Sequence, residues 1–512
     1  MSDDTHRRID LKGATVHGTG EPGAGRGDGY DADVVVVGAG YGGMVAAYRL
    51  WQAGYRVKVV DAMDRVGGRS WSTTLSDGSF VDIGAGWTGS TEHLVLELVD
   101  ELGLETYLQY GLGEDEGQNL FVAADGTLRR YDGLDFPVGD EAQVELAAAI
   151  AAIDLMAETV PVDTPWTAAQ AGEWDAISAG VWLRENVKDA EAAAVVRANL
   201  TTIFGLDPHA VSFLYLLWDS HMAGGVEKFG PGEGGSVQFR IDGGTQGIPL
   251  GIARRMGQDA FVLGSPVTEI RQDDGGVTVV SERATLRCAR AIVAIPTCLT
   301  GFIRYRPPLP PDRAQLIQRV PQGSAMKIHL VYDRAFWRDD GLTGNTFCID
   351  DSIVAQTLDA GGPAGVDEPG ILSCFLDDDG ARDLGRLTRE ERQALILQDL
   401  VPRFGPEILE LSSTITPNYV EFTSQDEEWI RGDYASTPGP RVLTASGFGP
   451  AIRAPVGRIH WAGVDTATVW YQSIEGAAQS GQRAALEVVA AGLPAPAGAP
   501  EAASAPVQGA TA

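Results

Sequence analysis

Residues 34–70 decide the fold of this chain, and they read VVVVGAGYGGMVAAYRLWQAGYRVKVVDAMDRVGGRS. A run of valines leads into the glycine-rich turn GAGYGG, a helical stretch follows, and a second apolar run ends at Asp61. Strand, glycine turn, helix, strand and acid occur here in the order of a dinucleotide-binding βαβ unit. The sequence therefore predicts an α/β, doubly wound (Rossmann-like) domain that includes this stretch.

The glycines and the acid of this unit have separate physical tasks. Gly38 permits the tight turn from strand to helix, and Gly40, with Gly42 in the same loop, lets the backbone approach a pyrophosphate. Gly43 lets the helix pack closely on the strand. The phosphate is expected at the helix N-terminus, where unpaired N–H groups favour an anion. At the end of the second strand, Asp61 is placed to accept hydrogen bonds from an adenosine ribose.

A second glycine loop follows the acid directly and reads RVGGRS over residues 65–70. An NAD-binding domain needs no such loop after its ribose-binding acid, so a longer cofactor that crosses the sheet edge is favoured. Gly68 provides a second close approach of the backbone. Arg69 is expected to pair with phosphate, because a guanidinium presents a fork of donors that matches phosphate oxygens.

Residues 61–70 resemble the acid-x-x-x-Arg-x-Gly-Gly-Arg-[Ser/Thr] signature of flavin-dependent amine oxidases, the monoamine oxidase group. Residues 81–87, VDIGAGW, are similar to the next segment of that family, which implies that Gly86 and Trp87 contact the cofactor. One departure is Met63, where the family usually has Arg. The resemblance implies a monoamine oxidase-like architecture, in which an α+β substrate domain is interleaved with the FAD-binding domain.

The C-terminal part carries a second matching segment. Residues 458–463, RIHWAG, form a short strand and turn, and a long helix begins at Ile474. They resemble the flavin motif at the C-terminal end of the family, which implies that Gly463, Asp465 and Ile474 hold the ribityl-pyrophosphate. By the same resemblance the backbone at Val267 meets the adenine. The likeness covers residues ~31 to ~490, and it predicts bound FAD.

The chain of 512 residues exceeds what one hydrophobic core usually serves, so two domains are expected. We assign an FAD-binding domain to residues 30–115, 241–310 and 450–491, and a substrate-binding domain to residues 116–240 and 311–449. Residues 1–29, rich in Gly and charge, and the Ala/Pro tail of residues 492–512 are expected to be disordered.

A formal net charge of −31 argues against nucleic acid and anionic membrane surfaces as partners. It is compatible with cationic substrates, although a solubility trait or an adaptation to the host's salt or pH explains it as simply. The four cysteines make no disulfide framework, and neither they nor the histidines have metal-ligand spacing. No apolar run reaches the length of a membrane span or anchor, and no hydrophobic segment follows Arg7-Arg8. A cytoplasmic protein is expected, and the sequence leaves its oligomeric state open, a homodimer included.

Lys327 is the sharpest catalytic candidate. It is the only lysine after Lys228 and lies in an apolar strand, where its ammonium must be solvated or paired, or else its pKa depressed by burial. In the family a lysine of this strand hydrogen-bonds a water beside the flavin. The alternative is a lysine on a strand face that points to solvent.

The family flanks the flavin with two aromatic rings that steer the amine nitrogen, and the resemblance assigns the first ring to Tyr434. The alternative for Tyr434 is an ordinary core aromatic. In animal monoamine oxidases the preceding residue is the cysteine that binds flavin covalently, and here it is Asp433, so noncovalent FAD is expected. The second ring falls at Ser473, which enlarges that wall unless Trp470 or Tyr471 supplies a face instead.

The sequence thus predicts an FAD-dependent oxidase that converts an amine to an imine, then an aldehyde or ketone plus ammonia or an amine, with O2 reduced to H2O2. Substrate and O2 are the expected partners. An L-amino-acid oxidase, or another dehydrogenase or desaturase on the same fold, is the first alternative. An amino-acid oxidase needs an arginine that pairs with the substrate carboxylate, and Arg240 and Arg431 are candidates. A non-catalytic flavoprotein is the second alternative.

Overall fold

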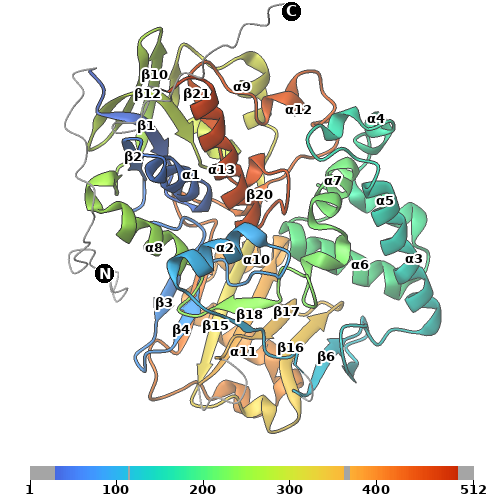
Figure 1. Cartoon of the computed structure of the whole chain (residues 1–512). Helices are drawn as coiled ribbons and strands as arrows, with labels where there is room; N and C mark the ends of the chain where they lie inside the picture. Colours follow the sequence, from blue (N-terminus) through green and yellow to red (C-terminus); the bar gives the residue numbers. More distant parts are fainter. Residues whose placement is uncertain (1–28, 114–115, 363–368, 494–512) are drawn as a thin grey trace, which may run out of the picture.

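The computed structural model describes residues 29–113, 116–362 and 369–493. It contains an eight-stranded sheet, a second sheet of seven strands, and a lobe of helices beside them (Figure 1). The expectations for residues 1–28 and 494–512 concern residues outside the described part. Of the helices in that part, none is both long enough and apolar enough to cross a membrane.

The first sheet has eight strands, and its centre is the predicted βαβ unit. β1 (Ala32–Val37) pairs in parallel with β2 (Val57–Val60) on one side and with β12 (Thr285–Val293) on the other. All six residues of β1 are buried, as expected for a parallel strand covered on both faces. The doubly wound fold predicted from the sequence is confirmed.

The other strands of this sheet come from distant parts of the chain. β12 also pairs in parallel with β21 (Ile459–Trp461) and antiparallel with β11 (Gly276–Ser281). The sheet continues from β11 through β10 (Val267–Asp273) to the edge strand β13 (Arg304–Arg306), and on the other side β9 (Phe261–Val262) extends it beyond β2. The strands of this sheet therefore come from three separate stretches of sequence. The first stretch holds β1 and β2, the second holds β9 to β13, and the third holds β21.

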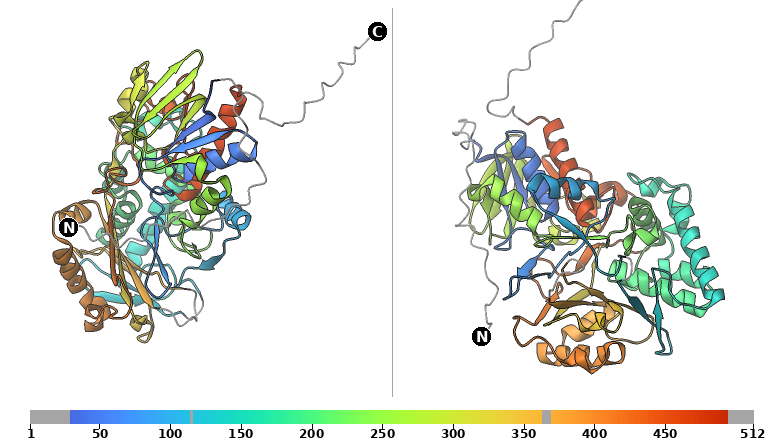
Figure 2. Two further views of the ribbon diagram at one scale, coloured as in Figure 1. Left: turned by 90° about the vertical axis from the view of Figure 1, so that its left-hand side faces the viewer. Right: turned by 60° about the horizontal axis from the view of Figure 1, so that its bottom comes forward.

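Two helices from opposite ends of the sequence pack against each other on this sheet. α1 (Tyr41–Gln52) and α13 (Ile474–Ala490) lie side by side in both Figure 1 and Figure 2. They approach so closely because glycines face each other: a Cβ on Gly481 would come within 2.1 Å of the carbonyl oxygen of Gly42. Helices α2 (His93–Leu102), α8 (Gly247–Met256) and α9 (Pro311–Ile317) complete the surroundings of this sheet.

The second sheet has seven strands in the order β19-β15-β18-β17-β16-β6-β7. Its strand β15 (Ala325–Tyr332) pairs antiparallel with two neighbours, so that Lys327 lies opposite Phe375 of β18 and Phe422 of β19. Helix α11 (Arg389–Phe404) packs on this sheet and shares its apolar core. The remaining elements here are β6 (Gln118–Val122), β7 (Leu128–Tyr131), β16 (Leu342–Cys348), β17 (Gln356–Asp359), β18 (Gly370–Asp377), β19 (Tyr419–Thr423) and α10 (Asp378–Gly385).

The helical lobe surrounds α7 (Phe213–Ala223), whose residues are all buried except His221. Its sequence is apolar nearly all round, as in a helix enclosed by others. The other helices are α3 (Asp140–Ala157), α4 (Ala171–Trp174), α5 (Ala179–Asn186), α6 (Ala190–Phe204) and α12 (Phe448–Ala451). Three short strand pairs lie outside the two sheets, namely β3 (Ser72–Thr74) with β4 (Phe80–Asp82), β5 (Thr106–Leu108) with β8 (Phe239–Ile241), and β14 (Gln322–Gly323) with β20 (Asp433–Ser436).

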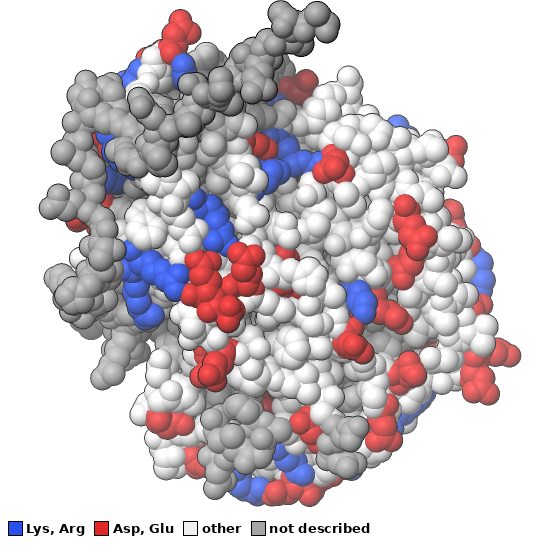
Figure 3. All heavy atoms as spheres, viewed as in Figure 1, with Lys and Arg blue, Asp and Glu red and all other residues white. Residues whose placement is uncertain are grey.

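Acidic and basic side chains are intermixed on the face that Figure 3 shows. An ion-pair network on the protein surface joins Arg49 of α1 to Glu97 and Glu101 of α2, and Arg255 of α8 also reaches Glu101. Ion pairs that remain partly open to solvent, as these do, contribute little to stability each.

Candidate active site

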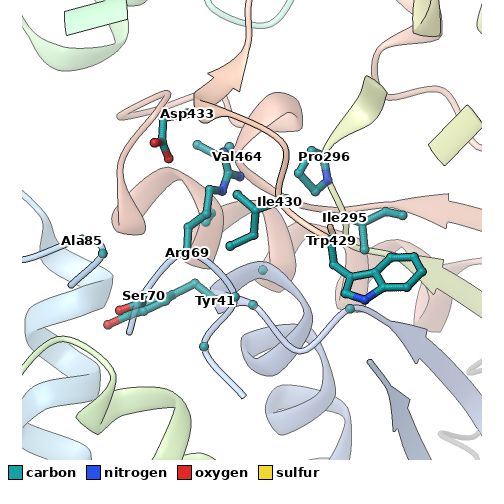
Figure 4. Close-up of a pocket in the computed structure, with 18 of the residues that line it drawn as sticks. Tyr41, Arg69, Ser70, Ala85, Ile295, Pro296, Trp429, Ile430, Asp433 and Val464 are labelled. Atoms are coloured by element: carbon teal, nitrogen blue, oxygen red, sulfur yellow. The ribbon is translucent and has the colours of Figure 1, made fainter. Parts of the chain in front are cut away.

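A cavity of about 600 Å³ lies between the glycine turn of β1–α1 and the second sheet. It begins among backbone atoms at residues 38–42 and reaches Lys327 and Tyr434 at its other end. Figure 4 shows part of its lining, with Tyr41, Arg69 and Ser70 on one side and Ile295 and Pro296 on another. The cavity therefore joins the two regions that the sequence singled out.

The glycine end of the cavity is built by close backbone contacts. Gly38 has φ +102°, a conformation that favours glycine, and a Cβ on Gly43 would come within 1.8 Å of the Gly38 carbonyl oxygen. Gly40 is the N-cap of α1 and provides no side-chain cap, so the first N–H groups of the helix are left for a ligand. A Cβ on Gly42 would come within 2.8 Å of the Gly463 nitrogen. The cradle thus fits an anionic pyrophosphate.

Asp61 lies where the second strand ends, at the cavity wall. Its carboxylate accepts hydrogen bonds from the backbone N–H groups of Ala39 and Met63, which orient it. Burial raises the pKa of Asp61, and the two N–H donors oppose that rise. Gly68 and Val267 line the same cavity, as predicted for a cofactor that extends along it.

Arg69 also lines the cavity, and its guanidinium donates a hydrogen bond to the backbone carbonyl of Tyr434. Burial raises the pKa of Asp433, and the nearby charge of Arg69 opposes that rise. Figure 4 shows both side chains at the same cavity. Arg69 therefore couples the second glycine loop to strand β20. Its predicted pairing with phosphate stays a prediction.

Lys327 points into the cavity from β15. Its Nζ donates a hydrogen bond to the Gly84 carbonyl at 2.9 Å, and a Cβ on Gly86 would lie 3.1 Å from the same nitrogen. Burial lowers the pKa of Lys327 to about 7, which Asp82 and Asp433 oppose and Arg240 reinforces. The alternative interpretation of Lys327, a lysine that points to solvent from a strand face, therefore does not fit its position in the structure.

Tyr434 and Ser473 reach the same cavity from β20 and from the start of α13. Burial raises the pKa of the Tyr434 hydroxyl well above its ordinary value, so the ring is neutral. Ser473 is the N-cap of α13: its oxygen accepts the Gly476 N–H at 3.2 Å and its hydroxyl donates to the Trp470 carbonyl at 2.9 Å. Ser473, whose small side chain leaves space at this wall of the cavity, therefore uses its hydroxyl group to cap α13.

Three predicted site residues are not in the cavity lining, whereas Gly463 and Ile474 of the C-terminal motif are. Gly43 serves the helix–strand contact described above, which is the task assigned to it. Asp465 uses its carboxylate to accept the backbone N–H groups of Thr297 at 2.6 Å and Ser436 at 2.9 Å, so it ties the segment that begins at Thr297 to the end of β20. Trp470, the third, is buried.

Tyr471 is also absent from the lining. Its hydroxyl donates to the Ser436 carbonyl at 3.2 Å, and its ring packs on Tyr215 and Trp218. Neither Trp470 nor Tyr471 therefore takes the place of the missing aromatic at Ser473.

Several lining residues were not predicted from the sequence. Phe375 and Phe422 lie at the cavity on either side of Lys327, and the strand register that brings them there cannot be read from separate segments. Gln472, next to Ser473, also lines it and donates to the buried Asp219 at 2.6 Å. Glu92 precedes α2, and burial raises its pKa to about 8. A single acid ahead of a helix gives no sequence signal of its own.

The family model of the flavin containing amine oxidoreductases matches residues 41–489. The chain belongs to this family. It is 37% identical over 476 residues to a putrescine oxidase from Kocuria rosea, in a match that covers 90% of this chain and 96% of that protein. It is 32% identical over 472 residues to an L-amino acid dehydrogenase from Synechocystis, with 89% of this chain and 94% of the other covered.

Solved structures agree with this assignment. A putrescine oxidase bound to putrescine superposes with a TM-score of 0.82 at 32% identity, over 90% of this chain and 99% of the other. The family and the monoamine oxidase-like fold predicted from the sequence are confirmed, and the chain is a flavin-containing amine oxidase. The interpretation as a non-catalytic flavoprotein is set aside.

The cofactor of this enzyme is FAD. The residues that line the cavity fit it: glycines without side chains at the pyrophosphate position, the uncapped N-terminus of α1, and Asp61 at the strand end. The attachment is noncovalent, as expected from Asp433, because a carboxylate stands where a thiol would be needed. The four cysteines all lie in the described residues, and none of them lines the cavity.

Proposed function

We propose that this enzyme oxidises an aliphatic amine at the carbon bonded to nitrogen, with O2 as the electron acceptor. That carbon loses a hydride equivalent and the nitrogen loses a proton, and water hydrolyses the resulting imine. One primary amine, one O2 and one water thus give one aldehyde or ketone, one NH3 and one H2O2. Bound in this cavity, FAD would supply the acceptor for the hydride equivalent and the redox link to O2. A cytoplasmic location stays a prediction.

The observation that carries the proposal is that Lys327 and Tyr434 line one end of a cavity whose other end is formed by the glycine turn of residues 38–42. Tyr434 forms one wall beside which an amine nitrogen is steered. The Lys327 ammonium is a proton donor at the same place, and the family resemblance implies that it also binds a water there. Arg69 ties the second glycine loop to this end through the Tyr434 carbonyl.

The wall at Ser473 supports an aliphatic substrate over a small arylalkylamine. An aromatic ring there would confine a flat substrate between two faces, whereas a serine leaves that space open. The carboxyl group of Asp433 lines the same cavity and, when ionised, favours cationic substrates. Primary monoamines, diamines and other polyamines all meet these conditions.

The organisation into domains follows the same proposal. Residues 30–115, 241–310 and 450–491 form the FAD-binding domain, because they hold the first sheet, α1 and α13. Residues 116–240 and 311–449 form the substrate-binding domain, which brings Lys327 and Tyr434 to the cavity. The contact of Arg69 with Tyr434 crosses the boundary between the two.

The rival activity, oxidation of L-amino acids, needs a guanidinium free to pair with the substrate carboxylate. Arg240 does not meet that need, because it is 1% exposed and forms an ion pair with Asp82 at 3.0 Å. Arg431 lines the cavity and lies over the Phe302 ring, so it is the remaining candidate for this alternative. The similarity to an L-amino acid dehydrogenase makes the comparison worth testing directly.

The test is anaerobic mixing of the purified enzyme with amines and with the corresponding amino acids, while the flavin absorbance is followed. Bleaching by aliphatic amines, and not by amino acids, is the expected result. Air is then admitted, and a peroxidase-coupled assay should find one H2O2 for each amine consumed. Bleaching by amino acids alone, or reoxidation without H2O2, would overturn the substrate class or the acceptor respectively.

A further inference from the structure

Aromatic faces surround the ammonium of Lys327. The Nζ atom lies 4.3 Å from the centroid of the Trp87 ring and 5.7 Å from that of Phe375. Its hydrogen bond to the Gly84 carbonyl uses one of three N–H donors, and in the described part of the chain no carboxylate lies within ion-pair distance of it. The negative faces of the rings therefore provide part of the stabilisation that water would give.

Three charged groups act on the Lys327 ammonium, whereas its direct strand neighbours are Phe375 of β18 and Phe422 of β19. Asp82 of β4 and Asp433 of β20 favour the ammonium, and Arg240 of β8 disfavours it. Asp82 is already engaged with Arg240 at 3.0 Å. The pKa of His329, two residues along the same strand, is lowered well below its usual value by burial, so that ring is neutral. Because burial places the pKa of Lys327 at about 7, a small change around it alters its charge at neutral pH.

The Trp87 ring is fixed from behind. Its Nε1 donates to the Oε1 of Gln109 at 2.6 Å. Gln109 is 1% exposed, and its amide nitrogen donates to the carbonyls of Asp359 at 2.6 Å and Tyr110 at 3.1 Å. The ring also packs against Phe375, with 5.8 Å between centroids. A ring held at two points presents one face to Lys327.

We propose that Trp87 is a positioning residue for Lys327. Its indole ring, held by the hydrogen bond to Gln109, presents a face to the Lys327 ammonium and keeps the ammonium directed at the reacting end of the cavity. This role is additional to the cofactor contact that the sequence predicts for Trp87. It rests on the proposed function only for the presence of Lys327 beside the flavin. Removing the face removes a stabilisation of the charged form, so Lys327 loses its proton at lower pH.

The test uses the purified enzyme with its FAD and needs no substrate. The flavin absorbance spectrum is recorded from pH 5 to 9, and the transition that is absent in Lys327→Met is assigned to Lys327. In Trp87→Leu, which keeps an apolar side chain without a ring, the midpoint should fall by about one pH unit. In Trp87→Phe, which keeps an aromatic face, most of that shift should be restored.

Trp51→Leu is the matched control, because Trp51 is 40% exposed on α1 and lies outside the cavity lining. Its midpoint should equal that of the wild type. Gln109→Leu frees the Trp87 ring without removing it and should shift the midpoint in the same direction by less, which serves as the test if Trp87→Leu does not fold. A midpoint that stays or rises in Trp87→Leu with full FAD content, or a wild type without a Lys327-dependent transition, overturns the proposal.

Discussion

The two ends of the cavity are built in different ways. At the cofactor end, Gly38, Gly40 and Gly42 bring main chain to the ligand, and the contacts of Gly38 and Gly42 leave no room for a methyl group. At the reacting end, Lys327 and Tyr434 bring partly buried titratable side chains from the substrate-binding side. The cofactor end depends on glycines that have no side chain, so it is sensitive to substitutions that add a side chain there. The reacting end depends on charge, so it responds to pH and to the loss of a partner.

The strongest way to break the cofactor end is Gly43→Ala. The added Cβ would lie 1.8 Å from the Gly38 carbonyl oxygen, and a backbone atom cannot move away as a side chain can. We expect a loss of about 5 kcal/mol or more in the free energy of unfolding, and little bound FAD. Thermal unfolding and the ratio of flavin absorbance to protein absorbance measure the two effects.

The control for that substitution is Gly172→Ala. Gly172 lies in α4, and a Cβ there meets nothing within 4 Å. Its effect should be neutral or stabilising by up to about 1 kcal/mol, because alanine favours the helix. A Gly43→Ala protein that keeps its FAD and its melting temperature would show that steric exclusion does not define this end.

Arg240→Leu tests whether the charges behind the reacting end are structural. Arg240 and Asp82 are both buried and paired at 3.0 Å, so the substitution leaves Asp82 without its cation. We expect a loss of about 3–5 kcal/mol in the free energy of unfolding, measured by urea titration. Arg386→Leu, which breaks an exposed pair with Asp383, should change nothing measurable.

The alternative for Arg240 would give a different pattern. If this arginine bound a substrate carboxylate, the variant would lose oxidation of amino acids while its unfolding free energy changed little. That outcome would contradict the structural role and revive the L-amino-acid oxidase interpretation.

What the sequence could and could not predict follows the same division. The glycine turn, Asp61 and the second glycine loop are local, so their order along the chain already specifies the shape of the cofactor end. Phe375 lies opposite Lys327 only because β15 and β18 pair in one register, and no short segment contains that information. Asp465 was expected at the cofactor, yet its carboxylate holds the Thr297 and Ser436 N–H groups. A motif locates a residue in the chain, whereas the neighbours decide which way its side chain acts.

Lys327→Met sharpens the comparison at the reacting end, because it removes charge while nearly conserving volume. We expect the enzyme to keep its FAD and to lose roughly 10²-fold in the rate of flavin reduction or of reoxidation, since a buried proton donor is gone. Stopped-flow absorbance in the two half-reactions measures these rates separately. Unchanged rates in both would remove Lys327 from the mechanism.

The same variant should also change how stability depends on pH. The pKa of Lys327 is about 7 in the folded enzyme and near 10.4 in an unfolded chain, so the unfolded state binds more protons between these values. Stability of the wild type from this group therefore rises as pH increases from about 7 to about 10. Lys327→Met lacks that rise. The free energy of unfolding of the variant minus that of the wild type should therefore become smaller between pH 6.5 and pH 9. A constant difference would contradict the depressed pKa.

The smallest expected effect lies at Ser473. This side chain lines the cavity, but its oxygen is used to cap α13 by accepting the Gly476 N–H. Ser473→Ala should therefore cost about 1 kcal/mol in unfolding free energy, whereas Ser473→Asn, which also caps helices well, should cost less. Because the hydroxyl has its structural partners in Trp470 and Gly476, amine oxidation by Ser473→Ala should match the wild type. A large loss of kcat in Ser473→Ala with unchanged stability would instead place the hydroxyl among the groups that act on the amine.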